Sequence, residues 1–160
     1  MPNRLGLNED GSPGKEFKWH RLAAPWVAHL AGNAAGLALR TVLVAADGDL
    51  VLPPLRQDAA AQWLDQLAQA WRAGMMAPPP VAVRTAFAWL ATPEDKQPRE
   101  QARRVYEGGF QARGERDRSL YLARQFPDFD SLWSDGGFAE WARTLYGPLH
   151  DAVAGRAEQP

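Results

Sequence analysis

The sequence predicts an α+β protein in which helices dominate. Apolar residues recur at three- and four-residue spacing through most of the chain, which is the period of an amphipathic helix. Residues 39–52 instead hold two short apolar, β-branched runs on either side of an Asp-Gly dipeptide, which is typical of a β-hairpin. About six helical segments and one hairpin therefore indicate a fold in which the hairpin packs on helices.

Composition narrows the class of protein. The 160 residues are enough for one domain with a sizeable core, and 46% hydrophobic with 23% charged residues is ordinary for a globular chain. The net charge of −1 gives no overall basic field for nucleic acid. The absence of cysteine excludes disulfides and thiolate metal sites. It also fits a protein of the reducing cytoplasm. No apolar run approaches the roughly 20 residues of a membrane helix, and no signal peptide is evident.

The N-terminal part divides into a lead-in and a helix. Residues 1–15 are rich in Asn, Asp, Gly, Ser and Pro, which predicts a flexible or partner-dependent lead-in. A single domain is expected over residues 16–155, with a frayed tail at 156–160. Between residues 17 and 33, Leu22, Trp26 and Leu30 form one helical stripe. Pro25 predicts either a kink or the start of a second helix.

A hairpin and a long helix follow. Asp47-Gly48 would supply the tight turn of the hairpin, because glycine accepts a positive φ. Pro53 and Pro54 end the second strand and suit a sheet edge. Residues 57–73 form the best helical pattern, and Gly74 would close it. If Trp63 and Leu67 are both buried, replacing either with alanine should cost about 3 kcal/mol.

Prolines divide the next part of the chain. Three consecutive prolines make residues 75–83 extended, and residues 85–90 are either a short helix or a strand. Thr92 as a cap, followed by Pro98, predicts two short helical pieces that end at Gly108-Gly109. Residues 111–118 are charged and loop-like. Asp135 can cap a last helix, and Pro148 breaks or kinks that helix late. Its apolar stripe is Phe138, Trp141, Leu145 and Leu149.

The least generic run is YLARQFPDFDSLW at residues 121–133. Pro127 stops a helix that arrives from Ser119, because the residue before a proline is pushed out of the helical region. Asp128 and Asp130 can then cap the next turn. Two interpretations follow: a linker held on the core by its aromatic rings, or a ligand or partner site built on Arg124 and the aspartates.

This run, with LYGPL at residues 145–149, resembles the extreme C-terminus of the RecC family, the gamma subunits of bacterial exodeoxyribonuclease V (RecBCD). Three further segments resemble the same family in the same order: WVAHL at 26–30, PPPVAVRTAFAW at 78–89 and ARRVYEG at 102–108. Members of that family are far longer, so this chain resembles their last part only.

The resemblance implies the C-terminal portion of a degenerate PD-(D/E)xK, restriction-endonuclease-like domain that lacks an active site. It implies a non-catalytic structural and DNA-channel domain of the RecBCD helicase–nuclease, which acts in double-strand break repair by homologous recombination. The expected partners are RecB and RecD, with DNA in the context of the full complex. Catalysis and ATP hydrolysis would lie in those partners, and neither a membrane nor a small-molecule substrate is expected.

The residues themselves give little sign of catalysis. Nuclease chemistry needs two acids and a lysine around Mg²⁺, which activates water and neutralises a phosphate. Glu16 and Lys18 match the E-x-K pattern, but they precede a helix instead of following a strand. The three histidines, His20, His29 and His150, lack a metal-ligand spacing. We therefore predict no catalytic residues, metal or cofactor, with a reduced metal-dependent nuclease using Glu16 and Lys18 as an alternative.

Arginines supply nearly all of the positive charge and interleave with acids between residues 99 and 118. This pattern fits either a solvated helix face with local ion pairs or a patch that contacts phosphate or a partner. A free-standing DNA-binding module is therefore a further alternative. Trp19, beside basic neighbours, could stack on a base or pack on the rest of the parent protein. The candidate DNA- or partner-binding residues are Arg103, Arg104, Tyr106, Arg124 and Trp19.

Overall fold

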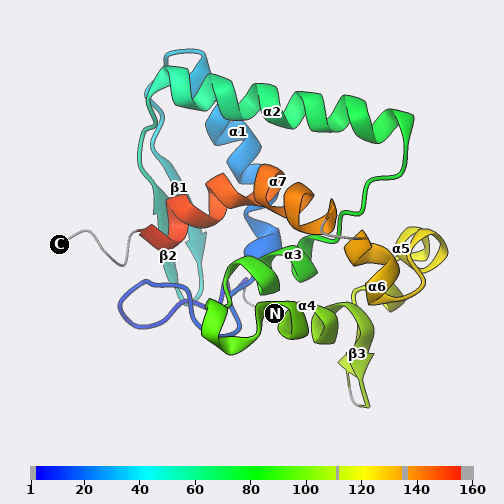
Figure 1. Ribbon diagram of the computed structural model, residues 1–160. Coiled ribbons are helices and arrows are strands. Elements are labelled where there is room, and N and C mark those ends of the chain that lie inside the picture. The colour runs from blue at the N-terminus through cyan, green and yellow to red at the C-terminus, as the bar shows by residue number, and fades with distance from the viewer. Residues whose placement is uncertain (1–2, 111, 135–136, 156–160) are drawn as a thin grey trace. The chain divides into compact units, whose positions relative to one another are not determined.

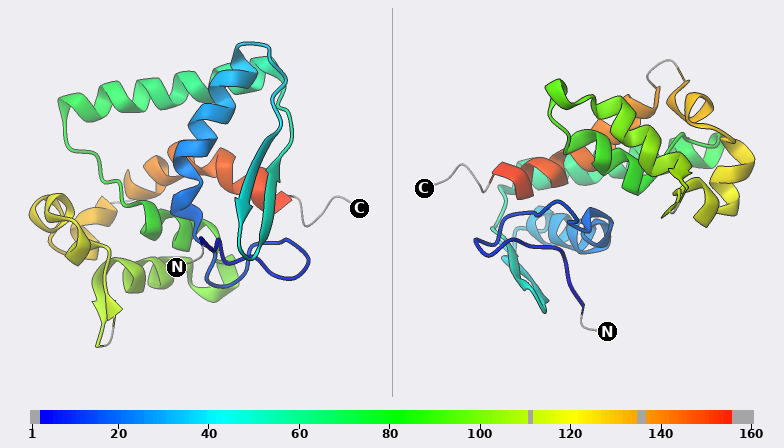
Figure 2. Two further views of the ribbon diagram at one scale, coloured as in Figure 1. Left: turned by 180° about the vertical axis from the view of Figure 1, so that it is seen from behind. Right: turned by 90° about the horizontal axis from the view of Figure 1, so that it is seen from below.

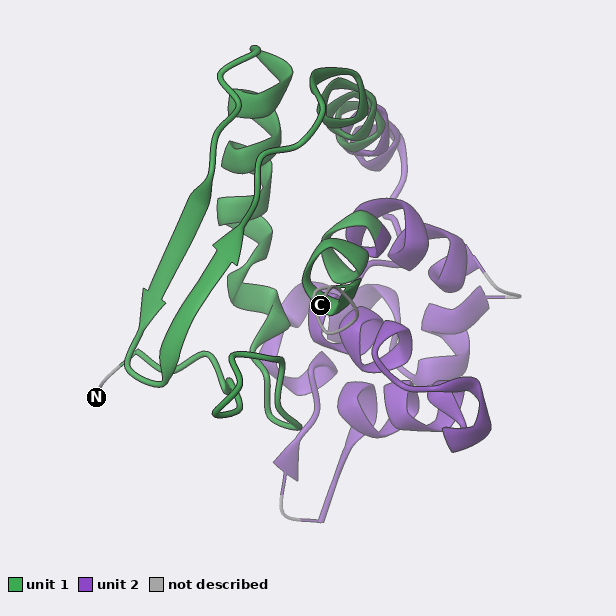
Figure 3. Ribbon diagram, turned by 90° about the vertical axis from the view of Figure 1, so that its left-hand side faces the viewer, with its two compact units in different colours: residues 1–68, 148–160 green, residues 69–147 purple. Residues whose placement is uncertain are grey.

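The computed structural model describes residues 3–110, 112–134 and 137–155. Helices make up most of these residues, beside one extended β-hairpin (Figures 1 and 2). The predicted helix-dominated α+β class is therefore confirmed. The chain forms two compact units, residues 1–68 with 148–160 and residues 69–147 (Figure 3). One domain over residues 16–155 stays a prediction, because compact units can be parts of one domain or separate domains.

The first helix of unit 1 has the predicted buried stripe. A short 3₁₀ turn, η1 (Trp19–Arg21), leads into α1 (Ala23–Ala34). Leu22, Trp26 and Leu30 are almost fully buried. Pro25 lies in the first turn of α1, where backbone N–H groups have no partner within the helix, so the helix starts before the proline instead of kinking at it.

The hairpin consists of β1 (Thr41–Ala45) and β2 (Gly48–Leu52), paired antiparallel from Thr41↔Leu52 to Ala45↔Gly48. The turn residues are therefore Ala46 and Asp47, one position earlier than the Asp-Gly dipeptide predicts. Gly48 follows the turn with φ 129°, a conformation that favours glycine.

Helix α1 lies beside the hairpin within unit 1 (Figures 2 and 3). His29 Nδ1 is 2.9 Å from Thr41 Oγ1. The Asn33 amide donates to the carbonyl of Leu39 at 3.2 Å and accepts from the N–H of Leu55 at 3.0 Å. Because His29 and Asn33 are both buried, these bonds satisfy polar groups while they fix the helix against the strands.

The Asp47 carboxylate holds the N-terminal segment against the hairpin turn. It accepts hydrogen bonds from the backbone N–H groups of Leu5 at 2.9 Å, Gly6 at 2.6 Å and Leu7 at 3.1 Å. Desolvation raises the pKa of Asp47, but these hydrogen bonds outweigh it and lower the pKa to about 2. The sequence predicts a flexible or partner-dependent lead-in over residues 1–15, and its described part has this defined anchor, with Leu5 buried.

Helix α2 (Gln57–Met76) continues past Gly74, so the predicted helix end at residue 73 is three residues too early. Its apolar face is less buried than predicted. Trp63 and Leu67 are only partly buried, and Trp71 is 68% exposed. Met75 and Met76 at its end are 69% and 88% exposed. Most of this face therefore lies outside the core.

Unit 2 is built around α3 (Val83–Leu90) and α4 (Pro98–Glu107). The ambiguous stretch at 85–90 is thus a helix. Between the two lies the 3₁₀ turn η2 (Glu94–Lys96), so the predicted two pieces are confirmed. Thr92 does not cap the first piece, because its hydroxyl donates back to the carbonyl of Ala88 at 2.6 Å. After α4 come the short strands β3 (Gly108–Gly109) and β4 (Ala112–Arg113) and the turn η3 (Arg116–Arg118).

Residues 121–133 form part of the unit 2 core. Helix α5 (Leu120–Gln125) ends before Pro127, as predicted, and α6 (Phe129–Trp133) begins at an Asp128 cap. Asp128 accepts from the N–H of Ser131 at 2.7 Å, and the Ser131 hydroxyl completes a capping box. Buried Leu122, Phe129 and Leu132 belong to the same hydrophobic cluster.

The last helix, α7 (Gly137–Ala154), runs through Pro148 without a break. Of its predicted stripe, Phe138 and Leu149 are buried, whereas Trp141 and Leu145 are partly buried. The proposed capping residue Asp135 and the tail at 156–160 lie outside the described residues.

Replacing each of two leucines of unit 1 with alanine should lower the free energy of unfolding by different amounts, because the two side chains differ in burial. Leu30→Ala should lower the free energy of unfolding by about 3 kcal/mol, because a fully buried side chain leaves a cavity. Leu67→Ala should cost about half as much, roughly 1–2 kcal/mol, since part of that side chain already contacts water. Urea unfolding followed by circular dichroism measures both. Equal costs would contradict the assigned burial.

The anchor at Asp47 predicts a dependence on pH. Its folded pKa of about 2 lies below the ordinary value of 3.8, so the stabilisation is fully present above pH 4 and is lost as pH falls through about 2. Asp47→Asn should speed hydrogen exchange at the amides of Leu5, Gly6 and Leu7 at neutral pH. Asp49→Asn, in the same hairpin, is the matched control and should leave that exchange unchanged.

Candidate functional site

Aromatic rings from four helices meet in unit 2. Trp89 of α3 lies edge-on to Trp133 of α6, with ring centroids 6.0 Å apart. Trp133 contacts Phe129 at 5.5 Å and Phe138 of α7 at 5.7 Å. Phe129 in turn lies 6.3 Å from Tyr106 of α4. These tilted and edge-to-face contacts have centroid separations within the range of favourable aromatic pairs.

Three arginines cover this group of rings. The guanidinium carbon of Arg99 lies 4.9 Å from the ring centre of Trp133. That of Arg103 lies 4.8 Å from Phe129, and that of Arg143 lies 4.6 Å from Trp89. Each distance is within the range of a cation–π interaction. We call the arginines and rings together the arginine–aromatic cluster: Arg99, Arg103, Arg143, Trp89, Tyr106, Phe129, Trp133 and Phe138.

The charge of Arg103 is neutralised within the chain. Its guanidinium donates to both Asp130 oxygens, at 2.6 and 3.1 Å. Glu107 and Glu100 lie 3.7 and 3.9 Å away. The hydrogen bond from Arg103 lowers the pKa of Asp130, and the same bond raises the pKa of Arg103. Asp130 was predicted as a possible cap, but its role is to join α6 to α4.

The other two arginines keep more of their charge available. Arg99 is 57% exposed and lies 3.5 Å from Asp130, a carboxylate that Arg103 already occupies. Arg143 is exposed, and within residues 3–110, 112–134 and 137–155 it makes no ion pair. These two side chains, each over a tryptophan ring, are the parts of the cluster best able to receive a phosphate or carboxylate.

Tyr106 lies in the core of unit 2, not on its surface. Its ring is fully buried, and its hydroxyl donates to the carbonyl of Phe126 at 2.6 Å. Burial raises the pKa of Tyr106 to about 12, so the hydroxyl stays protonated and keeps this bond. Tyr106 therefore helps to hold Phe126 and Phe129 in place within unit 2.

Sequence reasoning missed Glu115, a buried carboxylate at the first turn of α3. It accepts from the N–H groups of Arg84 at 3.0 Å and Thr85 at 2.8 Å, and from the Thr85 hydroxyl at 2.8 Å. Its N–H donates to the carbonyl of Val105 at 2.9 Å. A carboxylate here satisfies the open end of the helix and complements its dipole. In the sequence it is one acid among several in a charged loop.

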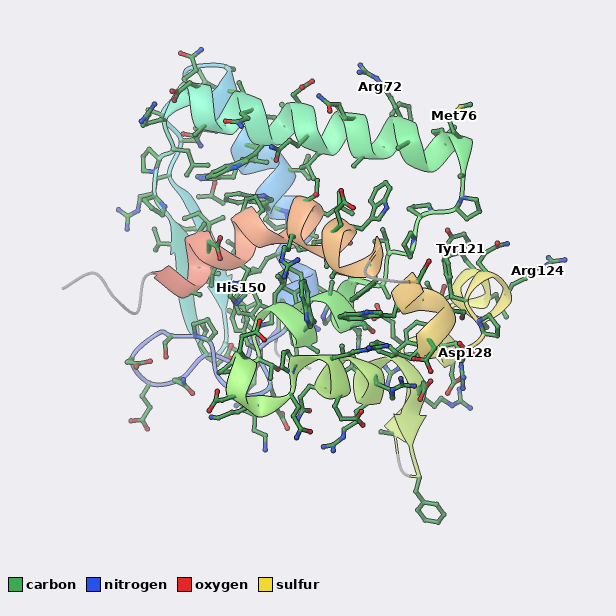
Figure 4. All side chains as sticks on the ribbon, in the orientation of Figure 1. Arg72, Met76, Tyr121, Arg124, Asp128 and His150 are labelled. Atoms are coloured by element: carbon green, nitrogen blue, oxygen red, sulfur yellow. The ribbon has the colours of Figure 1, made fainter. Side chains whose placement is uncertain are left out.

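The remaining candidates in unit 2 are dispersed. Arg104 is 65% exposed, and its guanidinium lies 3.7 Å from Glu100. Arg124 is exposed and points away from α5 (Figure 4). The described part of the chain offers Arg124 no ion pair, because Asp128 caps α6 and Asp130 pairs with Arg103. The structure therefore does not assemble a site from Arg124 and these aspartates.

Trp19 belongs to unit 1 and packs against two rings. It is half-buried, tilted over His150 at 5.0 Å and edge-on to Phe17 at 4.8 Å. The nuclease candidates lie nearby in the sequence. Glu16 is exposed, while the Lys18 ammonium donates to the carbonyl of Arg4 at 3.0 Å. Among the described residues, no three His, Cys, Asp or Glu side chains are grouped to hold a metal ion.

Comparison with known proteins gives two matches. The family model described as the RecC C-terminal domain matches residues 5–94. RecBCD enzyme subunit RecC from Escherichia coli (strain K12) is 32% identical over 110 residues, which cover 60% of this chain and 10% of that protein. The chain therefore corresponds to about a tenth of the length of the relative that it matches. None of the helices within the described ranges is long and apolar enough to span a bilayer.

The contacts of Arg103 predict that its substitution destabilises the fold, whereas substitution of the adjacent Arg104 does not. Arg103→Gln should lower the urea midpoint of unfolding, because Asp130 loses its partner and Phe129 loses its covering cation. The loss should shrink at high salt, which screens the ion pair. Arg104→Gln is the control and should leave the midpoint unchanged. Equal effects of both substitutions would show that the Arg103–Asp130 pair does not hold α6.

Proposed function

The chain belongs to the RecC C-terminal domain family, and on this basis we propose that it is a non-catalytic domain of a RecBCD-type helicase–nuclease. It acts in double-strand break repair by homologous recombination, through contacts with RecB, RecD and DNA. The family match over residues 5–94 carries this proposal. Cleavage and ATP hydrolysis belong to the partner subunits, and this domain is the last portion of a degenerate PD-(D/E)xK fold.

The arginine–aromatic cluster supports a contact role. Arg99 and Arg143 present guanidinium groups that lie over the rings of Trp133 and Trp89. A guanidinium whose motion is restrained by a ring contact binds phosphate or carboxylate with less further loss of side-chain entropy. Both DNA phosphates and acidic groups of a partner subunit fit such a site. The pair is therefore a better candidate contact than Arg103, whose bonds are already made within the chain.

A free-standing DNA-binding module is the second candidate. The observation that favours it is the set of exposed arginines in unit 2, which comprises Arg72, Arg84, Arg99, Arg104, Arg113, Arg118, Arg124 and Arg143. Binding of this kind depends on phosphate contacts and falls steeply with salt. It differs from the first proposal because it requires no partner subunit.

One co-purification experiment distinguishes the two candidate functions. The chain is co-expressed with the RecB and RecD subunits of the same organism, and each is tested for capture by the tagged chain. The proposal expects capture of RecB or RecD, and no DNA cleavage by the purified chain with Mg²⁺ or Mn²⁺. Metal-dependent cleavage that is abolished by Lys18→Ala would instead establish the nuclease alternative. Salt-sensitive DNA binding without capture would establish the free-standing module.

The cluster predicts which arginines matter for binding. The double substitution Arg99→Glu/Arg143→Glu should weaken the contact with DNA or with RecB and RecD at least about tenfold, because each change replaces an attraction with a repulsion. Fluorescence anisotropy over a salt series measures the DNA contact, and quantitative capture measures the subunit contact. Arg40→Glu/Arg56→Glu, at two exposed arginines of unit 1, changes the net charge by the same amount and is the control. Equal loss with the control would rule out a local site.

A further inference from the structure

The chain contains three Asp-Gly dipeptides, at residues 10–11, 47–48 and 135–136. In this dipeptide an aspartate is most prone to rearrange without an enzyme, because glycine has no side chain to keep its backbone nitrogen away from the preceding carboxyl group. The first two dipeptides lie in unit 1, and the third lies outside the described residues. The surroundings of Asp10 and Asp47 therefore show whether the fold treats the same dipeptide alike.

The rearrangement has two steps that need only water. The glycine nitrogen attacks the protonated carboxyl group of the aspartate, so a C–N bond forms and a C–O bond breaks. The released hydroxyl takes the amide proton and leaves as water, and a succinimide ring remains. Water then adds to the former backbone carbonyl, its C–N bond breaks, and the nitrogen regains a proton. The product is isoaspartate, in which the chain runs through the side-chain carboxyl group and the mass is unchanged.

The carboxylate of Asp47 is held by the N-terminal segment, residues 3–18. Its Oδ1 accepts from the N–H of Leu5 at 2.9 Å, and its Oδ2 accepts from Gly6 at 2.6 Å and Leu7 at 3.1 Å. These donors lie 40 to 42 positions earlier in the sequence and meet the carboxylate at the turn end of the hairpin (Figure 2). Desolvation alone would raise the pKa of Asp47, but these bonds lower it to about 2. The carboxylate therefore stays ionised at neutral pH and has no hydroxyl to release.

Further contacts keep the segment in this place. The N–H of Ala46, in the hairpin turn, donates to the carbonyl of Asn3 at 2.9 Å. The N–H of Lys18 donates to the carbonyl of Leu5 at 2.7 Å, and the side chains of Leu5 and Phe17 are buried. A carboxylate that a packed segment bonds on both oxygens cannot turn freely toward the glycine nitrogen.

Asp10 is exposed, and its side-chain bonds come from its own loop. Its Oδ1 accepts from the N–H of Ser12 at 2.9 Å and from the Ser12 hydroxyl at 2.6 Å. The bond from the hydroxyl is the main cause that lowers the pKa of Asp10. Because these bonds join residues two positions apart, they move with the loop and do not tie the carboxylate to another element. A Cβ added at the adjacent Gly11 would meet no atom within 4 Å, so the loop is open on that side.

We propose that Asp47–Gly48 is a latent isomerisation site, which the N-terminal segment keeps closed and which opens when this segment leaves the hairpin turn. Isoaspartate lengthens the backbone of the turn by one carbon atom and leaves the carboxylate on Cα. The anchor of the N-terminal segment then cannot re-form with the same geometry, and the pairing of Ala45 with Gly48 is disturbed. Release of the segment is therefore reversible only until the turn has rearranged.

Isomerisation of the unmodified chain tests the proposal, with Asp10 as the internal comparison. The chain is incubated at neutral pH, either folded or in urea, and isoaspartate at each dipeptide is measured by chromatography and mass spectrometry of its peptides. In urea Asp10 and Asp47 should convert at similar rates, because only the local sequence acts. Folding should slow conversion at Asp47 at least about tenfold more than at Asp10, because the neutral carboxyl group that reacts becomes rare. Equal slowing at the two positions overturns the proposal.

Two glycine substitutions in the segment distinguish loss of the anchor from strain in the loop. Gly6 has φ 86°, and a Cβ there would lie 2.7 Å from the carbonyl oxygen of Glu16, so Gly6→Ala should displace the segment. Conversion at Asp47 should then rise at least about tenfold at neutral pH. Gly11→Ala is the matched control, because Gly11 also has a positive φ, 79°, but open space for a Cβ. This variant should leave conversion at Asp47 unchanged.

Circular dichroism and hydrogen exchange of the hairpin amides show whether each variant is folded. Unchanged conversion at Asp47 in a folded Gly6→Ala chain overturns the proposal. If that variant does not fold, the comparison of Asp10 with Asp47 in the unmodified chain still decides, because it needs no substitution. Conversion at Asp10 should fall in Gly11→Ala, since alanine has the side chain that glycine lacks, and this decrease confirms that the method detects each site.

Discussion

The arrangement of unit 2 depends on one buried carboxylate. Glu115 binds the first turn of α3 through Arg84 and Thr85, while its own N–H is fixed to Val105 of α4. These hydrogen bonds compensate for the burial of the carboxylate. Loss of the carboxylate would leave several buried donors without partners, which would destabilise the fold. Helices α3 and α4 supply Trp89 and Tyr106, so the aromatic rings, and the arginines above them, are positioned by this bond network.

The sequence predicted correctly those features that depend on a few neighbouring residues, such as helix ends and tight turns. Pro127 and Asp128 predicted the end of α5 and the start of α6, because a pre-proline restriction and a cap act over a few residues. The hairpin was predicted for the same reason, although its turn lies one residue earlier. The contacts of Glu115 with Thr85, and of Arg103 with Asp130, join residues far apart in sequence. Spacing and propensity contain no information about such pairs.

The same distinction applies to the candidate site. Arg103 and Arg104 are adjacent in sequence, but successive residues of a helix point in directions about 100° apart. One therefore lies against Phe129 and Asp130, while the other is exposed beside Glu100. Arg143 was not identified as a candidate, because only the packing of α7 brings it to Trp89. Tyr106 was identified as a contact residue, whereas burial makes it part of the framework.

The exposed end of α2 provides a chemical reporter. Met75 and Met76 are both well exposed to solvent, and the third methionine of the chain, Met1, lies outside the described residues. Thioether sulfur is readily converted to the sulfoxide when oxidants reach it. Brief peroxide treatment followed by mass spectrometry of the peptide would therefore footprint this helix end. Shielding by a bound subunit would register as slower sulfoxide formation, without any substitution in the protein.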